Sequence, residues 1–179
     1  MKKTLITVLV TVIVCFSVIG TTYAWLMDKT QTITNTFTAG DIKIKLEETT
    51  GSEYKMIPGT TLTKDPTVTV EKNSEDCWLF VKITKSLNFD AFVTYEIADG
   101  WTELTNGSGV YYRSVDLKDS DQEFAVIKNN VMTVNEDVTK AQLSSIGSGL
   151  ELQVTAYAVQ ELGFESNPAG AWEKAQTLG

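Results

Sequence analysis

The stretch Leu150-Glu-Leu-Gln-Val-Thr-Ala-Tyr-Ala158 alternates between aliphatic side chains and side chains that carry a polar group. Successive side chains of a β-strand point to opposite faces of its sheet, so this period of two predicts a long antiparallel strand with one buried face. Residues 77–84 instead begin with apolar side chains at every position, which predicts a central strand covered on both faces. These two strands indicate a sheet protein.

Shorter strands and turns occupy much of the remaining sequence. Residues 42–46 alternate like a half-buried strand, Pro58-Gly59 predicts a turn, and residues 68–70 mark another strand. Three pairs of residues that tolerate the positive φ of tight turns separate short apolar segments and predict a series of hairpins: Asp99-Gly100, Asn106-Gly107 and Asn129-Asn130.

Helices are scarce in the sequence. Residues 137–146 predict one short helix whose inward side chains are Val138, Ala141 and Leu143. Asn167-Pro168 has the order of an N-cap followed by proline in the first turn, and predicts a C-terminal helix that carries Trp172. About nine strands and these two helices predict an all-β fold, a jelly-roll or immunoglobulin-like antiparallel β-sandwich with one or two short helices.

The N-terminus has the layout of a secretory signal peptide. A basic pair, Lys2-Lys3, precedes an uncharged apolar run over residues 5–20. Thr22 and Ala24 are small residues at the two positions that a signal peptidase reads, so we expect residues 1–24 to be removed and the mature chain to begin at Trp25. The alternative is an uncleaved N-terminal anchor, although the run is shorter than the about 20 residues that usually span a membrane. In both cases the folded part lies outside the cytoplasm.

The remaining residues, 25–179, predict a single domain, because they suffice for one core and contain no evident linker. The formal charge of −8 argues against nucleic acid or an anionic lipid surface as a partner. We expect contact with the membrane only through the signal segment, before its cleavage. Cys77 is the single cysteine outside the signal segment, so no intramolecular disulfide forms and the fold depends on its hydrophobic core.

The absence of histidine from the chain excludes Ser-His-Asp and Cys-His catalytic sites and the H-E-x-x-H type of zinc hydrolase. We therefore predict neither an enzyme nor a cofactor. The candidates for a metal site are the oxygen ligands of one acidic segment, Asp116, Asp119, Asp121 and Glu123. Lys118 interrupts this segment and the glycine of an EF-hand loop is missing, which favours a solvated acidic turn instead.

Five segments carry a resemblance to a known family: Thr22-Tyr-Ala-Trp-Leu-Met-Asp28, Thr36-Phe-Thr-Ala-Gly40 with the Ile-x-Ile strand after it, Ile57-Pro-Gly59, Leu62-Thr-Lys-Asp65 and Gly109-Val-Tyr-Tyr112. They resemble the TasA/camelysin family of exported proteins of Gram-positive bacteria. The resemblance implies a jelly-roll-like sandwich, export through a signal peptidase of the SipW type, and a structural role at the cell surface or in the biofilm matrix. Some relatives have been called metalloproteases, a label that the absence of histidine argues against for this chain.

The resemblance also implies that such proteins form fibres with themselves or with related matrix proteins, the N-terminal strand of one subunit completing a sheet of the next. Residues 25–40 contain a suitable donor strand, in which Ile33 and Phe37 lie on one face and threonines, among them Thr32, Thr34 and Thr36, lie on the other. The alternative for this strand is pairing within its own domain. The alternative function is a monomeric surface module that binds carbohydrate, cell wall or a host ligand through exposed aromatic side chains such as Tyr111-Tyr112 and the tryptophans.

Overall fold

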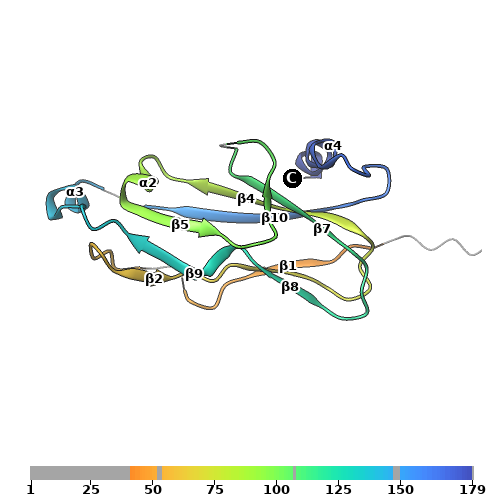
Figure 1. Cartoon of the computed structure of the whole chain (residues 1–179), viewed down its shortest axis with the longest axis horizontal. Helices are drawn as coiled ribbons and strands as arrows, with labels where there is room; N and C mark the ends of the chain where they lie inside the picture. The colour runs from red at the N-terminus through yellow and green to blue at the C-terminus, as the bar shows by residue number, and fades with distance from the viewer. Residues whose placement is uncertain (1–40, 52–53, 107, 147–149, 179) are drawn as a thin grey trace, which may run out of the picture. The chain divides into compact units, whose positions relative to one another are not determined.

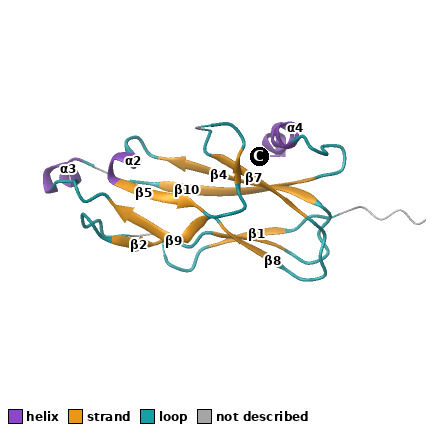
Figure 2. Cartoon of the chain, in the orientation of Figure 1, coloured by secondary structure: helices purple, strands orange, loops and turns teal. Residues whose placement is uncertain are grey.

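The computed structural model describes residues 41–51, 54–106, 108–146 and 150–178, which form a mostly β protein with antiparallel strand pairs throughout (Figures 1 and 2). The strands are β1 (Ile44–Glu47), β2 (Thr61–Thr63), β3 (Thr67–Val70), β4 (Cys77–Lys85), β5 (Val93–Ile97), β6 (Thr102–Glu103), β7 (Val110–Val115), β8 (Gln122–Ala125), β9 (Ile127–Val134) and β10 (Leu152–Gln160). The helices are α2 (Phe89–Phe92), α3 (Lys140–Ser145), α4 (Pro168–Ala175) and the 3-10 turn η1 (Gln176–Leu178).

These strands build two layers. One layer is the sheet β10-β4-β7-β6, and the other combines the sheets β1-β3-β8 and β2-β9-β5. The second layer is continuous because β2 leads into β3 and β8 leads into β9 across short breaks. Hydrogen bonds bridge these breaks, from the N–H of Val126 to the carbonyl of Pro66 and from the N–H of Lys64 to the carbonyl of Asn130, both at 2.9 Å. The predicted all-β sandwich is confirmed, with α2 as a helix that the sequence analysis did not expect.

The core between the layers is centred on β4. Cys77, Leu79 and Val81 point from β4 into this core and are fully buried, as are Val68 and Val70 of β3 in the facing layer. Burial of a valine or leucine side chain contributes about 1.5–3 kcal/mol, so this central cluster is the main stabilising feature of the sandwich.

The opposite face of β4 is covered by α4. Trp78 and Phe80 point away from the inter-layer core and pack against Trp172, whose ring lies 5.4 Å from that of Phe80. Asn167 caps the helix by accepting a hydrogen bond from the N–H of Gly170 at 3.0 Å. The prediction of a proline-initiated C-terminal helix is confirmed, and its position explains why the sequence of β4 is apolar on both faces.

Two of the predicted hairpins are wrong. Gly100 has a φ of +87°, as a tight turn requires, but the turn leads from β5, which pairs with β9, to β6, which pairs with β7 in the other layer. Asn129 and Asn130 also have positive φ, yet both lie inside β9, where the register with β5 shifts. The same backbone conformation serves a layer crossing, a bulge or a hairpin, so residue type alone does not select among them. The third hairpin, β6–β7, is confirmed by the pairing of the two strands.

The predicted helix at residues 137–146 is shorter than expected. It starts at Lys140 after Thr139, which forms a capping box with Gln142. Ala141 was expected to face inward but is exposed, while Val138 is buried ahead of the helix and Leu143 is half-buried. The helix lies at one end of the layers, so only a narrow side of it meets other residues.

Candidate docking site

One side of the sandwich ends in strands whose outer edges have no strand partner among the described residues. These strands are β10 in one layer and β1 and β2 in the other. Side chains that point into the core are more exposed on these edge strands than on the central strands. Val81 of β4 is fully buried, whereas its register partner Ala156 on β10 is half-buried. Leu46 on β1 is 37% exposed, although it lies beside the fully buried Val68 of β3.

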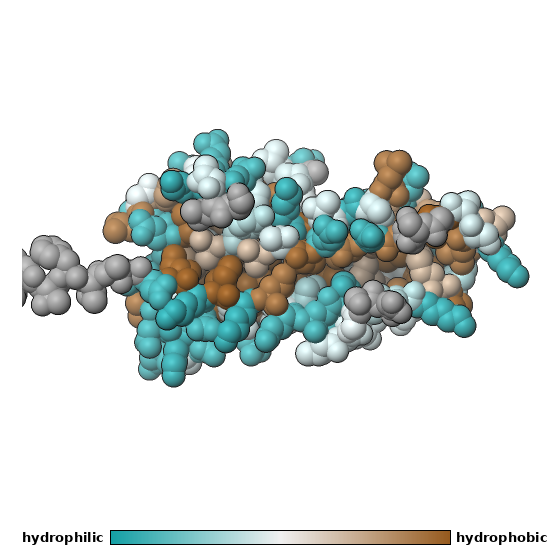
Figure 3. Space-filling view, turned by 180° about the vertical axis from the view of Figure 1, so that it is seen from behind, coloured by the Kyte–Doolittle hydropathy of each residue, from teal (hydrophilic) through white to brown (hydrophobic). Residues whose placement is uncertain are grey.

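A partly exposed apolar seam therefore runs between the two layers, where β1 and β10 approach each other. Its half-buried members come from the segment just before β1, from β1 and from β10: Ile42, Ile44, Leu152, Val154, Ala156 and Ala158. The view from behind shows a band of hydrophobic surface between hydrophilic margins (Figure 3). A row of free backbone N–H and C=O groups beside apolar side chains is the surface to which a further strand adds.

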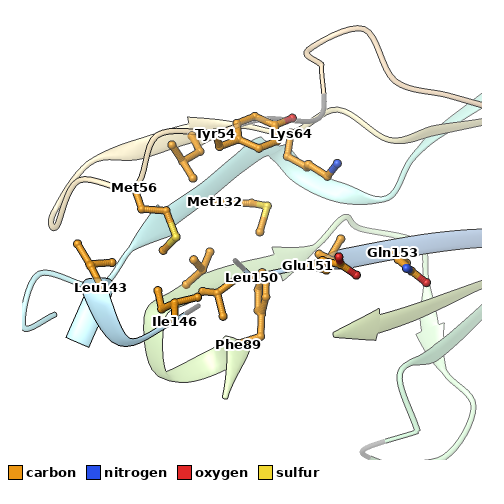
Figure 4. A pocket seen from close by; sticks show the side chains of 13 residues that line it. Tyr54, Met56, Lys64, Phe89, Met132, Leu143, Ile146, Leu150, Glu151 and Gln153 are labelled. Atoms are coloured by element: carbon orange, nitrogen blue, oxygen red, sulfur yellow. The ribbon is translucent and has the colours of Figure 1, made fainter. Parts of the chain in front are cut away.

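The seam widens into a pocket of about 640 Å³ at the end where β10 begins. Met56 and Met132 approach the hollow from one side, and Phe89, Ile146 and Leu150 approach it from the other (Figure 4). The remaining lining residues are Tyr54, Leu62, Lys64, Val93, Leu143, Glu151, Leu152 and Gln153. A pocket of this size and apolar lining is suited to side chains or to an apolar ligand.

The polar rim of this pocket contains the ion pair of Lys64 with Glu48 and one further carboxylate, that of Glu151. The ammonium group of Lys64 lies 2.6 Å from the carboxylate of Glu48 and 5.6 Å from the centre of the Tyr54 ring. The Tyr54 hydroxyl donates to the carbonyl of Gly51 at 2.7 Å, and burial raises its pKa. Because Lys64 is already paired, the rim does not select strongly for an anion.

Asp65 ties the loop that contains Thr49 and Thr50 to the end of β2. Its carboxylate accepts hydrogen bonds from the backbone N–H groups of both threonines, at 3.1 and 3.0 Å, and from both hydroxyls. These donors hold the pKa of Asp65 well below its ordinary value of 3.8, because they stabilise the ionised form. The carboxylate thus positions one wall of the pocket rim.

The four acidic metal candidates do not converge. Asp121 accepts a hydrogen bond from the N–H of Lys72 at 2.8 Å, and the backbone carbonyl of Asp116 accepts one from Gln122. Within the described ranges, no group of three or more Asp, Glu, Cys or His side chains is placed to hold a metal ion. Asp119 and Glu123 belong to the same exposed segment, which joins β7 to β8 and continues into β8.

The aromatic side chains proposed as a sugar-binding face are mostly enclosed. Tyr111 and Trp101 pack on the core between the layers. Tyr112 and Trp78 pack with Trp172 of α4 on the opposite face of the sheet. They therefore belong to two different clusters rather than to one exposed platform. The alternation along β7, which sends neighbouring tyrosines to opposite faces, explains the separation.

The predicted cleavage residues Thr22, Ala24 and Trp25 lie outside the described residues. The same holds for the predicted donor strand with Thr32, Ile33, Thr34, Thr36 and Phe37, so both remain predictions. The sequence did not predict the pocket. Among its lining residues are Met56, Met132 and Leu150, which are apolar but far apart in the sequence, and only the folded chain brings them together.

The family comparison matches residues 1–75 of the 179-residue chain to the family described as Camelysin metallo-endopeptidase. No curated protein and no solved structure matches the chain. Among the helices of the described part, none has the length and apolar content needed to cross a membrane.

The metal that the family's name implies is not supported by the donor set of this chain. The chain lacks histidine, and the described carboxylates and Cys77 do not form a cluster that fits a catalytic metal. The match supports a likeness to camelysin in the N-terminal part of the chain. The resemblance to the TasA/camelysin family is thus confirmed for the N-terminal 75 residues of this chain.

Proposed function

We propose that the exported chain is a structural, non-enzymatic protein of the cell surface or extracellular biofilm matrix that assembles into fibres by strand addition. The observation that carries this proposal is the partly exposed apolar seam between β10 and the edge of the β1 layer. Exposed strand edges usually promote association unless charge, bulges or covering segments protect them. Here the edge strand β10 has nine residues and an apolar inner face.

The N-terminal stretch Thr30-Gln-Thr-Ile-Thr-Asn-Thr-Phe-Thr38 is complementary to this edge. It also has nine residues, so as a strand it would run the length of β10, about 30 Å. It carries no charge, so the acidic domain does not repel it. Ile33 and Phe37 would face the seam, with the amides of Gln31 and Asn35 on the same face. The threonines would face outward, where they favour extended backbone and cross-strand pairing.

Deletion of residues 25–38, with the leader retained, tests the proposal. We expect the deletion chain to be exported, to unfold cooperatively like the parent and to form no fibres by electron microscopy. A matched variant with Thr32→Ser and Thr36→Ser keeps the apolar face and should still polymerise. Polymers formed by the folded deletion variant would show that the strand is not the assembly element.

The competing hypothesis is a monomeric binding module, and the pocket of about 640 Å³ is the observation that favours it. The two hypotheses differ in the size distribution of the pure exported protein. A chain that stays monomeric at high concentration and binds glycans or cell walls would support the binding module. Concentration-dependent polymers without added ligand would support the structural role.

A further inference from the structure

We infer that the pocket at the start of β10 is the socket for the Phe37 side chain of a second copy of this chain. The inference rests on the proposed function, and it adds the anchoring residue, the acceptor site and the direction of the added strand. Two observations carry it. The first is that the distance from Asp41 to the pocket exceeds the reach of the chain between Asp41 and Phe37, and the second is the apolar lining of the pocket.

The pocket and Asp41 lie at opposite ends of β10. The pocket is lined by residues 150–153, where β10 begins. The carbonyl of Asp41 accepts a hydrogen bond from the N–H of Glu75 at 3.1 Å, and the carbonyl of the adjacent Asp76 accepts one from the N–H of Glu161, directly after the end of β10. The nine residues of β10 hold these two points about 27 Å apart.

Phe37 cannot bridge that distance within its own chain. It precedes Asp41 by four residues, which span at most about 14 Å when fully extended. Ile33 precedes Asp41 by eight residues, which span about 28 Å when fully extended. Ile33 could therefore reach the pocket of its own chain or that of a second copy, and it does not distinguish between these two arrangements. A Phe37 side chain found in the pocket must therefore belong to another copy.

The chemistry of the pocket suits an aromatic anchor. Met56 and Met132 supply flexible thioethers, which make favourable contacts with aromatic rings, and Leu150 and Ile146 supply branched apolar surface (Figure 4). The single basic side chain that lines the pocket, Lys64, is neutralised by Glu48. The volume of about 640 Å³ accommodates a phenyl ring together with the strand that carries it.

This placement sets the direction of the added strand. The donor chain leaves its own domain near Asp41 and enters the next copy at the pocket, so Phe37 docks first and Ile33 lies farther along β10, over the half-buried Val154 and Ala156. The donor then runs antiparallel to β10. Asp41, from which the donor segment extends, and the socket lie at different ends of the described domain. The contact is therefore heterologous and repeats head to tail, which produces an open filament.

Paired cysteines test the inference in the full-length chain, recovered after export from a host that processes its leader. The test pair is Phe37→Cys with Leu143→Cys, because Leu143 lines the pocket. We expect mild oxidation to give a ladder of disulfide-linked dimers and higher oligomers on a non-reducing gel. A mixture of the single variants Phe37→Cys and Leu143→Cys should give a disulfide-linked dimer but no higher oligomers, because each chain then carries only one introduced thiol. The native Cys77 is fully buried, so we expect it to form no disulfide in this experiment.

Two control pairs define specificity. Phe37→Cys with Leu162→Cys joins the donor to an exposed leucine beyond the other end of β10, and Thr36→Cys with Leu143→Cys moves the thiol to the opposite face of the donor. Both should cross-link at least about fivefold less than the test pair. In addition, Phe37→Ala should raise the concentration needed for polymerisation at least about tenfold, while Phe37→Leu restores most of the affinity.

The outcomes separate this inference from the proposed function. Fibres that form normally while the test pair cross-links no better than the controls, or cross-links within one chain, would refute the Phe37 socket and leave strand-mediated assembly intact. A wild-type chain that forms no fibres under any condition would refute the proposed function and the socket with it.

Discussion

At the scale of single residues, Asp65 links the edge of β2 to the loop that borders the pocket. Its carboxylate accepts bonds from the N–H and hydroxyl groups of Thr49 and Thr50. A carboxylate with several donors is held ionised, and its pKa falls below the ordinary value of 3.8. Because the folded pKa is lower than the unfolded one, ionised Asp65 stabilises the fold at pH values above 3.8, and this contribution is lost as the pH falls through the ordinary value toward the folded one.

Asp65→Asn should therefore lower the free energy of unfolding at pH 7, and the deficit relative to the parent should shrink below about pH 4. Urea unfolding at pH 7 and at pH 3 measures this difference. Asp119→Asn, at an exposed position, is the matched control and should leave stability nearly unchanged at both pH values. An Asp65→Asn deficit that grows in acid would contradict the role assigned to the ionised carboxylate.

At the scale of elements, α4 functions as a cover for the outer face of the β10-β4-β7 sheet. The Trp172 ring lies 5.4 Å from Phe80 and 5.2 Å from Tyr157, so one helical side chain contacts two strands. The Trp78 indole donates to the carbonyl of Phe164 at 3.0 Å and fastens the segment that leads into the helix. Without α4 the sheet would expose a large aromatic patch, which favours non-specific association.

Trp172→Ala should lower the free energy of unfolding by about 3–5 kcal/mol, because it removes a large buried aromatic side chain and leaves a cavity. The neighbouring exposed residue Glu173 supplies the control, since Glu173→Ala should change stability by no more than about 0.5 kcal/mol. Denaturant unfolding with a common slope for the three proteins measures both values. Equal stabilities of the two variants would show that α4 does not contribute to the core.

At the scale of the whole molecule, both layers and α4 depend on β4, the strand that lies between β10 and β7 and contributes to two hydrophobic clusters. Cys77 at its start reports on this arrangement. The thiol is fully buried, and burial raises its pKa to about 11, so the native protein presents almost no reactive thiolate at neutral pH.

Labelling of Cys77 by a thiol reagent at pH 8 should therefore require global unfolding. Its rate should rise with urea in parallel with the unfolding rate measured by tryptophan fluorescence. The Trp172→Ala variant, being less stable, should label faster under the same conditions. Rapid labelling of the parent protein without denaturant would mean that β4 opens locally, independently of the rest of the sandwich.

Much of the fold could be predicted from local sequence, and the failures share one cause. Alternation located β10, and a run of apolar residues located β4, because side-chain period directly reflects which faces are buried. Asn129 and Asn130 identified a site of positive φ but not its use, since the partner of each flanking strand is chosen by contacts distant in sequence. The pocket could not be predicted for the same reason, because its walls come from the segment before β2 and from β2, α2, β5, β9, α3 and β10.

The sequence by itself determined the strands β4 and β10, the Asn167-Pro168 helix start and the burial of Cys77. Each follows from the pattern of apolar residues or from the backbone preference of one or two residues. The tertiary structure alone decided which strands became edges. Burial at β10 and β1 depends on what lies beside them in space, so the partly exposed seam and its pocket appeared only when the two layers were assembled.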